Sequence, residues 1–368
     1  MTRPAPLLPL REKGLGDEGA PIRHPLSHPH KNPVVAQPSR CYVDRMNHLD
    51  RIRGALYGHL CGDALGVPYE FKAASALPAT ILWTGHGSHG QAPGTFSDDG
   101  SLMLCSTLSL SERGSFDATD MGRRFLRWWR EGYLAAGGEA FDIGGATTRA
   151  LLRIEQGVPA LEAGPSESRD NGNGSLMRIL PMSLFGLGLS LGEQADLAHR
   201  ASRITHGHVR SQVCCALHSA LVARLWAGDA RETAFAAACA DLRRLYAAGE
   251  AFAEELAHVE TFEKRGGSGY VVDCLRCAWD AVRDAGSYEE AVVRAVRYGN
   301  DTDTTAAVAG GLAGFVFGID GVPQAWRDAL RLEGWQRVAL EEAALALAAR
   351  TGTGNASTLA AERLEFIA

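Results

Sequence analysis

The sequence lacks any run of about 18 consecutive apolar residues, the length that a helix needs to cross a bilayer. Residues 1–30 also lack the continuous apolar core of a signal peptide. An excess of positive charge is absent too: the 368-residue chain has a net charge of -6, which disfavours nonspecific binding to nucleic acid. We therefore expect a cytoplasmic protein with no membrane segment and no nucleic-acid partner.

Cysteines at the spacings of a disulfide framework are absent. Most of the eight cysteines lie inside apolar or helical stretches, which is typical of reduced thiols in a core. Cys274 and Cys277 have the spacing of a zinc pair, but no second pair of Cys or His residues follows closely, so we expect no zinc site. The alternation of apolar and polar residues that marks a strand is also nearly absent.

Helical periodicity dominates instead, and it predicts an all-α fold, a compact multi-helix bundle. Asn47 is the expected N-cap of a first helix, with Asp50 three residues later. In a helix predicted over 118–132, Met121, Phe125 and Trp129 share one face. Further helices are predicted over 101–111, 146–156, 176–185, 193–227, 230–248, 271–285, 288–298, 304–317, 324–332 and 334–349.

Residues 1–46 contain eight of the fifteen prolines, which oppose helix formation, and they show little apolar periodicity. We expect a flexible N-terminal extension there, either without structure or acting as a partner-binding arm. Residues 47–350 are expected to form a single domain, and residues 351–368 a C-terminal tail.

Oxygen-bearing side chains gather at the start of the helix predicted over 304–317. Every residue from Asn300 to Thr305 carries one, directly before an apolar run. Such a cluster suits a hard cation such as Mg²⁺ or Mn²⁺, which prefers oxygen ligands. An ordinary N-cap is the alternative, but a cap needs one or two such residues. We therefore favour a metal site that includes Asp301, Asp303 and Thr304.

A second cluster, Ser97-Asp98-Asp99, also precedes an apolar run. Adjacent carboxylates repel each other, so they are costly when buried unless a cation lies beside them, whereas on a surface turn they would be ordinary. Glu70 follows Gly66 and Pro68, which force a turn and fix its direction. His86 and His89, in the loop that follows, are interpreted as solvated and are left out of the site.

Four further loops carry candidate ligand contacts. Asp142 to Gly145 and Asn171 to Ser175 each precede a predicted helix, where backbone N–H groups can bind phosphate, although a plain glycine turn is the alternative for the first. His206 follows a helical segment and is either a ligand contact or a capping residue. Tyr270 ends a glycine-rich loop and either stacks on a base or belongs to the core.

Seven of these segments occur in the order found in the ADP-ribosylglycohydrolase family, which includes the dinitrogenase-reductase-activating glycohydrolases. They are residues 62–66 with Glu70, 97–99, 141–144, 171–178, 205–206, 268–271 and 300–304. The sequence resembles that family from about residue 48 to 318. Ser97 stands where the family often has Thr, which keeps the hydroxyl, and residues before 47 are not covered.

The resemblance implies an all-helical hydrolase with a dinuclear metal site in a central cleft. Two Mg²⁺ or Mn²⁺ ions would be held by Ser97, Asp98, Asp99, Asp301, Asp303 and Thr304. Glu70 and Asp142 would be the catalytic carboxyls. Substrate would be bound by Gly144, Asn173, Gly174, Ser175, Met177, His206 and Tyr270.

The implied reaction is hydrolysis of the N- or O-glycosidic bond between ADP-ribose and a protein side chain, with arginine the expected acceptor. One alternative is an immunity protein whose N-terminal extension binds an ADP-ribosyltransferase toxin. Another is a different Mg²⁺ hydrolase, a phosphatase or nucleotide hydrolase, which would release phosphate in place of ADP-ribose.

Overall fold

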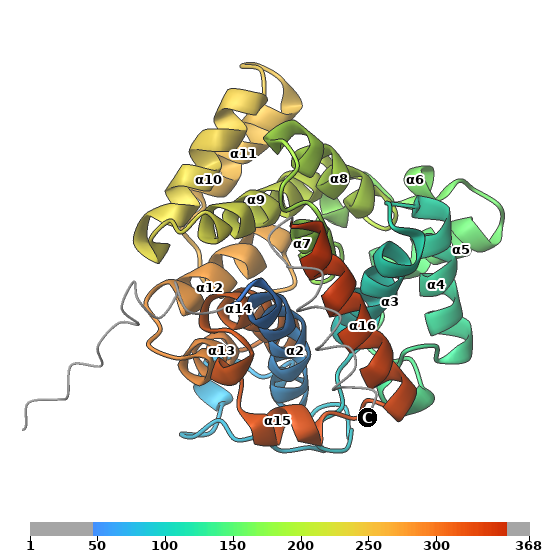
Figure 1. Ribbon diagram of the computed structural model, residues 1–368, viewed down its shortest axis with the longest axis vertical. Helices are drawn as coiled ribbons and strands as arrows, with labels where there is room; N and C mark the ends of the chain where they lie inside the picture. Colours follow the sequence, from blue (N-terminus) through green and yellow to red (C-terminus); the bar gives the residue numbers. More distant parts are fainter. Residues whose placement is uncertain (1–46, 352–368) are drawn as a thin grey trace, which may run out of the picture. The chain divides into compact units, whose positions relative to one another are not determined.

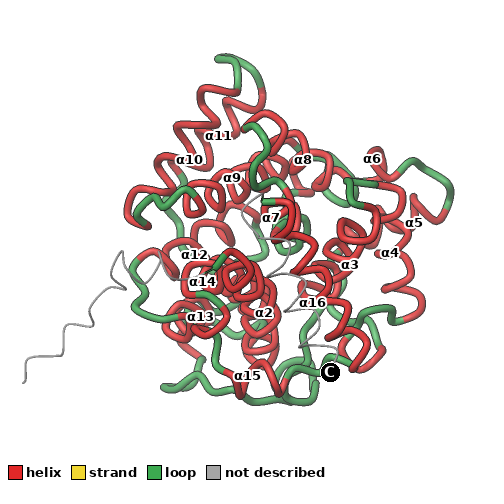
Figure 2. The backbone as a smooth tube through the Cα atoms, viewed as in Figure 1, coloured by secondary structure: helices red, strands yellow, loops and turns green. Residues whose placement is uncertain are grey.

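The computed structural model describes residues 47–351, and in this range it contains fifteen α-helices and no strand (Figures 1 and 2). The all-α prediction is confirmed. The predicted extension over 1–46 and, apart from Thr351, the predicted tail lie outside the described residues. The helices are α2 (His48–Gly66), α3 (Asp98–Arg113), α4 (Ala118–Glu131), α5 (Gly145–Glu155), α6 (Ala160–Ala163), α7 (Leu180–Phe185), α8 (Leu191–Arg203), α9 (Val209–Trp226), α10 (Arg231–Leu245), α11 (Ala251–Thr261), α12 (Val271–Arg283), α13 (Tyr288–Val296), α14 (Thr302–Phe317), α15 (Gln324–Ala329) and α16 (Gly334–Arg350).

Several helix boundaries follow from local chemistry. Asn47 caps α2, since its side-chain oxygen accepts a hydrogen bond from the N–H of Asp50 at 2.8 Å, as predicted. The helix predicted over 176–185 begins only at Leu180. Pro181 in its first turn has no N–H to bond the carbonyl of Met177, so the helix cannot continue upstream unbroken.

The prediction of a single helix over 193–227 is wrong, because the chain forms two helices, α8 and α9, with a break at residues 204–208. The backbone there bonds to another loop. The N–H of Gly207 donates to the carbonyl of Pro165 at 2.8 Å, and the N–H of Gly164 donates to the carbonyl of Arg203 at 3.1 Å. His208 then caps α9. Helix α11 was not predicted, although its buried residues Leu256 and Val259 have helical spacing.

The central feature is the close packing of α2 against α14, which lie side by side in Figure 1. Glycine recurs every fourth residue along α2, at 54, 58, 62 and 66. A Cβ atom on Gly58 would lie 2.5 Å from the carbonyl oxygen of Gly310, and one on Gly54 or Gly62 would approach the α14 backbone more closely still. These glycines therefore let the two backbones touch.

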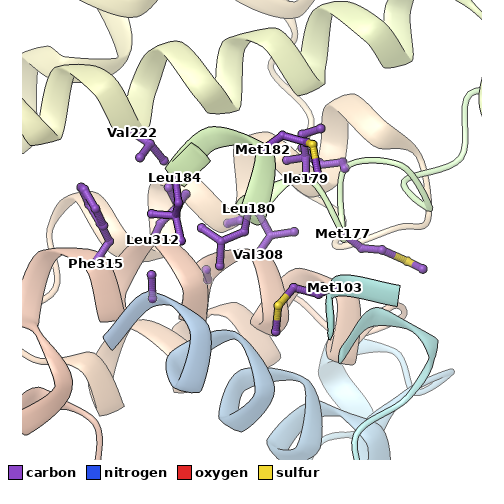
Figure 3. Close-up of a cluster of buried hydrophobic side chains, with 14 of the residues drawn as sticks. Met103, Met177, Ile179, Leu180, Met182, Leu184, Val222, Val308, Leu312 and Phe315 are labelled. Carbon is purple, nitrogen blue, oxygen red and sulfur yellow. The ribbon is translucent and has the colours of Figure 1, made fainter. Parts of the chain in front are cut away.

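A core of apolar side chains surrounds this pair (Figure 3). Leu180 and Leu184 of α7 pack toward α14, where Leu180 lies next to Gly311. Nearly every residue of α14 is buried, including its polar first turn. The helix therefore lies in the interior of the described fold, and it begins at the predicted polar cluster. None of the helices within residues 47–351 is long and apolar enough to span a membrane.

We predict that Gly62→Ala destabilises the protein by about 1–3 kcal/mol, because the new methyl group would overlap the carbonyl of Ala306 in a tightly packed interface. Thermal and denaturant unfolding would measure the loss. Gly192→Ala is the matched control: Gly192 is an exposed helical glycine, and a Cβ there would meet only Leu245 at 3.8 Å. This control should leave stability unchanged or raise it. Equal stability of the two variants would contradict the packing argument.

Candidate active site

The first turn of α14 and the end of α2 meet at Asp303. A Cβ on Gly66 would overlap the Cα of Asp303, so only glycine permits this approach. The hydroxyl of Thr302 donates to the carbonyl of Gly66 at 2.8 Å and fixes the two ends together. Asp303 is fully buried as a result, and its carboxylate lies beneath the surface of the site.

Asp63 brings the second predicted cluster to the same place. Its carboxylate accepts hydrogen bonds from the N–H of Ser97 at 3.0 Å and from that of Gly100 at 2.7 Å, which anchors the start of α3 against α2. Ser97 is the N-cap of α3, and Asp98 and Asp99 form its first turn. Asp63 belongs to the segment 62–66, and the sequence indicates no specific role for its side chain. In the structure it orients the loop that carries the expected ligands.

The carboxylate oxygens at this meeting point are incompletely paired. Among the described residues, both side-chain oxygens of Asp303 and Oδ1 of Asp99 and Asp301 are buried without a hydrogen-bond partner. The hydroxyls of Ser97 and Thr304 both donate to Oδ2 of Asp99, at 3.0 and 3.2 Å. Buried carboxylates with free lone pairs are costly unless a cation is bound. These all-oxygen donors suit Mg²⁺ or Mn²⁺.

Electrostatics support the same interpretation. Burial and the repulsion of neighbouring carboxylates raise the pKa of Asp98, Asp99 and Asp303 well above the usual range. Burial likewise raises the pKa of Asp63 to about 7, although hydrogen bonds from backbone N–H groups oppose the shift. A divalent cation would relieve this repulsion. Two sets of carboxyls lie close enough together to bind one metal ion each. They are Asp63, Asp99 and Asp303, and Glu70, Asp301 and Asp303.

The two predicted catalytic carboxyls lie together with His89, which is not among the predicted site residues. Nε2 of His89 contacts a carboxylate oxygen of Glu70 directly and lies 3.8 Å from Oδ1 of Asp142. The interpretation of His89 as a solvated loop residue is therefore wrong. Its ring lies near those of Phe71 and Phe141, with centroids 5.4 and 5.3 Å away. The loop has no periodicity, and no sequence signal indicated this contact.

Burial raises the pKa of Glu70 to about 10, with the charges of Asp142 and Asp301 adding to the effect. Burial also raises the pKa of Asp142 above its ordinary value. Asp142 adopts a positive φ of 64°, a conformation that is uncommon for residues other than glycine. Such strain persists where the surroundings fix it, and here it aims a carboxyl at the cluster.

A cavity of about 330 Å³ opens above these carboxylates. Asp98, Asp301 and Thr304 line the cavity, and we call them its floor, whereas Ser97, Asp99 and Asp303 are buried and do not line it. Ten predicted site residues line the cavity: Glu70, Asp98, Asp142, Gly144, Asn173, Gly174, Met177, His206, Asp301 and Thr304. Segments far apart in sequence therefore converge on one concave surface.

The cavity walls come from three loops and a helix start. The loop of Gly172 pairs with that of Tyr270, since the N–H of Asn173 donates to the carbonyl of Gly269 at 3.0 Å. The Asn173 amide also donates to Oδ2 of Asp301 at 2.9 Å, which links the wall to the floor. Helix α5 begins at Gly145 without a side-chain cap, so its first N–H groups are free to bind an anion.

Two predicted contacts do not line this cavity. Ser175 is fully buried, and its hydroxyl accepts a hydrogen bond from the hydroxyl of Ser202 at 2.9 Å. The hydroxyl of Tyr270 lies 2.8 Å from Nε2 of His258, and its ring packs edge-on against that of Phe262. Both residues therefore support the walls from behind.

Comparison with known proteins decides the family. The family model named ADP-ribosylglycohydrolase matches residues 44–356, which includes every segment that forms the cavity. The chain belongs to the ADP-ribosylglycohydrolase family. The resemblance predicted from the sequence is thus confirmed, and the protein is a hydrolase of this family with ADP-ribosyl glycohydrolase activity.

Similar proteins with named activities include ADP-ribosyl hydrolases. The chain is 31% identical over 305 residues to the "ADP-ribosylarginine hydrolase Tri1" of Pseudomonas putida (strain GB-1), covering 81% of this chain and 79% of that protein. It is 29% identical to the "ADP-ribosyl-[dinitrogen reductase] glycohydrolase" of Rhodospirillum rubrum, covering 77% and 91%. A solved "ADP-ribosylglycohydrolase-related protein complex" matches with a TM-score of 0.67 and 32% identity, covering 82% of this chain and 98% of that chain.

We predict that the metal-depleted glycohydrolase loses stability as the pH rises from about 7 to 9. Burial lowers the pKa values of His59, His199, His206 and His218, and in this range these histidines are neutral in both the folded and the unfolded chain. The folded protein holds protons on Asp98, Asp99, Asp303 and Glu70 more tightly than the unfolded chain, because their pKa values are raised. That stabilisation is present at low pH and is lost as the pH rises toward the raised values. Melting temperatures with and without Mg²⁺ or Mn²⁺ test this.

The added cation should raise the melting temperature more at the higher pH, where the carboxylates are charged. Asp303→Asn should flatten the pH dependence of the metal-depleted protein, since it removes one buried acid. Asp241→Asn alters a carboxylate that pairs with Arg224, far along the chain in α10, and should change little. A metal-depleted protein whose stability rises over this range would contradict the interpretation.

Proposed function

We propose that this protein hydrolyses the N-glycosidic bond between ADP-ribose and arginine side chains of modified proteins. The observation that carries the proposal is the group of unpaired carboxylate oxygens on Asp99, Asp301 and Asp303 beneath a cavity lined by helix-start and loop backbone. This donor set supports binding of two Mg²⁺ or Mn²⁺ ions by Ser97, Asp98, Asp99, Asp301, Asp303 and Thr304. When bound, such a pair would coordinate ribose hydroxyls and lower the pKa of a water molecule.

Residues of this chain would bind the diphosphate and transfer the protons. The free N–H groups at the start of α5 and the backbone around Gly174 would bind the diphosphate. Water would attack the anomeric carbon as the bond to the guanidine nitrogen breaks, so one proton must leave the water and one must reach the departing nitrogen. Glu70 and Asp142 are the cavity carboxyls outside the proposed ligand set, and they would exchange those protons.

An arginine acceptor is favoured by the wall next to Glu70. Phe71 lines the cavity and is 70% exposed, which is unusual for a phenylalanine. Its backbone is held firmly: the N–H of Phe71 donates to the carbonyl of Asn300 at 2.6 Å, and the N–H of Asn300 donates to that of Lys72 at 2.7 Å. A guanidinium stacks well on an aromatic face, and its N–H groups can donate hydrogen bonds to the oxygens of the nearby carboxyls. The two relatives at 31% identity are also named ADP-ribosylarginine hydrolases.

We predict that the protein with Mg²⁺ or Mn²⁺ releases ADP-ribose from arginine-linked substrate, with EDTA abolishing the reaction. Asp303→Ala should lower kcat/KM by more than the roughly 10–100-fold cost of losing an outer partner of a metal ligand. Asp241→Asn should keep the parent rate. Release of free phosphate in place of ADP-ribose would instead indicate a phosphatase, and full activity of Asp303→Ala in EDTA would rule out the metal site.

We further predict that Phe71→Ala lowers kcat/KM on arginine-linked ADP-ribose by about tenfold, the loss expected for a partly desolvated cation–π contact. Serine-linked ADP-ribose, with no cationic leaving group, should lose less. Phe71→Tyr should retain activity. Leu82→Ala removes another exposed apolar side chain, 60% exposed and outside the cavity, and should have no effect. An equal loss of kcat/KM on both substrates would show that Phe71 does not distinguish the acceptor side chain.

The immunity alternative concerns an ADP-ribosyltransferase toxin bound by the N-terminal extension. Those residues lie outside the described range, so this partner stays a prediction from the sequence. The hydrolytic proposal needs no contribution from them, because every residue that it uses lies between Glu70 and Thr304.

A further inference from the structure

His206 lies in the break between α8 and α9, and its ring reaches the cavity wall while the residue is almost completely buried. The edge that carries Nε2 faces the Asn171–Ser175 loop. A Cβ on Gly172 would lie 3.5 Å from Nε2, and one on Gly174 would lie 2.8 Å from Cε1. Within residues 47–351, Nε2 has no hydrogen-bond partner, so it is the ring atom available to a ligand.

The other ring nitrogen is held from behind by two residues without an assigned role. Nδ1 of His206 lies 2.9 Å from the hydroxyl of Thr205. That hydroxyl accepts a hydrogen bond at 2.6 Å from Nη2 of Arg178, which is 1% exposed. The guanidinium also donates twice to the carbonyl of Ala201 and lies over the ring of Phe125 at 4.7 Å.

The number of hydrogens available on Arg178, Thr205 and His206 fixes which group donates in each hydrogen bond of this series. A guanidinium has only donors, and Arg178 stays protonated at neutral pH even though burial lowers its pKa to about 10. It must therefore donate to Thr205. The Thr205 hydroxyl is buried with a single hydrogen, and Nδ1 of His206 is the acceptor within reach. If Nδ1 carried a proton instead, two donors would point at the Thr205 oxygen and its own hydrogen would be left without an acceptor, which is costly when buried.

We propose that Arg178 and Thr205 are positioning residues that hold His206 in the tautomer protonated on Nε2, so that this N–H donates to an oxygen of the ligand in the cavity. That the ligand is ADP-ribose rests on the proposed function, whereas the tautomer does not.

The charge state of His206 agrees with this arrangement. Burial lowers its pKa to about 3, with the positive charges of Arg178 and Arg149 adding to the effect. A neutral ring has one N–H, so without the relay either nitrogen could carry it. Among residues 47–351, the guanidinium of Arg178 donates to the carbonyl of Ala201 and to the hydroxyl of Thr205 and forms no ion pair with a carboxylate, so its charge is available to polarise that hydroxyl. Arg178 would therefore orient His206 in addition to donating to the carbonyl of Ala201 near the end of α8.

The test uses the full chain with ¹⁵N-labelled histidine. Long-range ¹H–¹⁵N spectra report which ring nitrogen of each histidine carries the proton, and a His206→Gln sample identifies the signals of His206. We expect Nε2–H in the parent protein across neutral pH. Thr205→Val, which keeps the side-chain shape but removes the hydroxyl, should give a mixture of tautomers. Thr205→Ser should restore Nε2–H.

Calorimetry with free ADP-ribose gives a second readout. Thr205→Val should weaken binding by about tenfold, the range expected when one buried hydrogen bond is lost, and Thr205→Ser should recover most of it. Thr107→Val is the control, since Thr107 is equally buried in α3 and its hydroxyl bonds only within that helix, to the carbonyl and sulfur of Met103. It should bind ADP-ribose like the parent.

A parent spectrum showing Nδ1–H or a mixture would overturn the proposal, and this outcome does not depend on the folding of any Thr205 variant. Retention of pure Nε2–H in Thr205→Val would also overturn it, because something other than the hydroxyl would then set the tautomer. If the parent shows Nε2–H but binds no ADP-ribose, the proposed ligand is wrong while the relay stands on the Thr205 spectra alone.

Discussion

The contact between the backbones of α2 and α14 is the constraint on which the site depends. Glycines at every fourth position of α2 allow the helices to approach until backbone atoms touch. The approach ends where Gly66 meets the first turn of α14, so Asp303 is pressed into the interior beside Asp63 and Asp99. Any side chain larger than hydrogen along this line would separate the helices and with them the carboxylates.

That packing creates a cluster which is unfavourable on its own terms. Several carboxyls are buried within reach of each other with oxygens unpaired, and their raised pKa values express the repulsion among them. Apolar residues of α14 and α7 are buried close to each other, and their burial favours the folded state (Figure 3). A site of this kind is poised to bind cations, since the protein has already brought the ligands together and desolvated them.

The cavity is lined by groups of two kinds. Glu70 and Phe71 supply a carboxyl and an exposed aromatic ring, which under the proposed function would contact the acceptor side chain. The start of α5, the Asn171–Ser175 loop and His206 supply N–H donors, which suit the oxygens of a diphosphate and its sugars. In this arrangement the acceptor and ADP-ribose would be recognised by different residues.

The sequence by itself determined the all-α class and the polar starts of α3 and α14, because helical periodicity and N-cap chemistry are local properties. Its ordered motifs also indicated the family and ten residues that line the cavity. It did not reveal His89, whose contact with Glu70 joins two aperiodic loops, nor the relay from Arg178, which spans 27 residues to Thr205. It also placed Ser175 and Tyr270 in the site, although their side chains point behind it. The direction of a side chain on a loop depends on which distant segment packs against it, so only the tertiary structure decided these contacts.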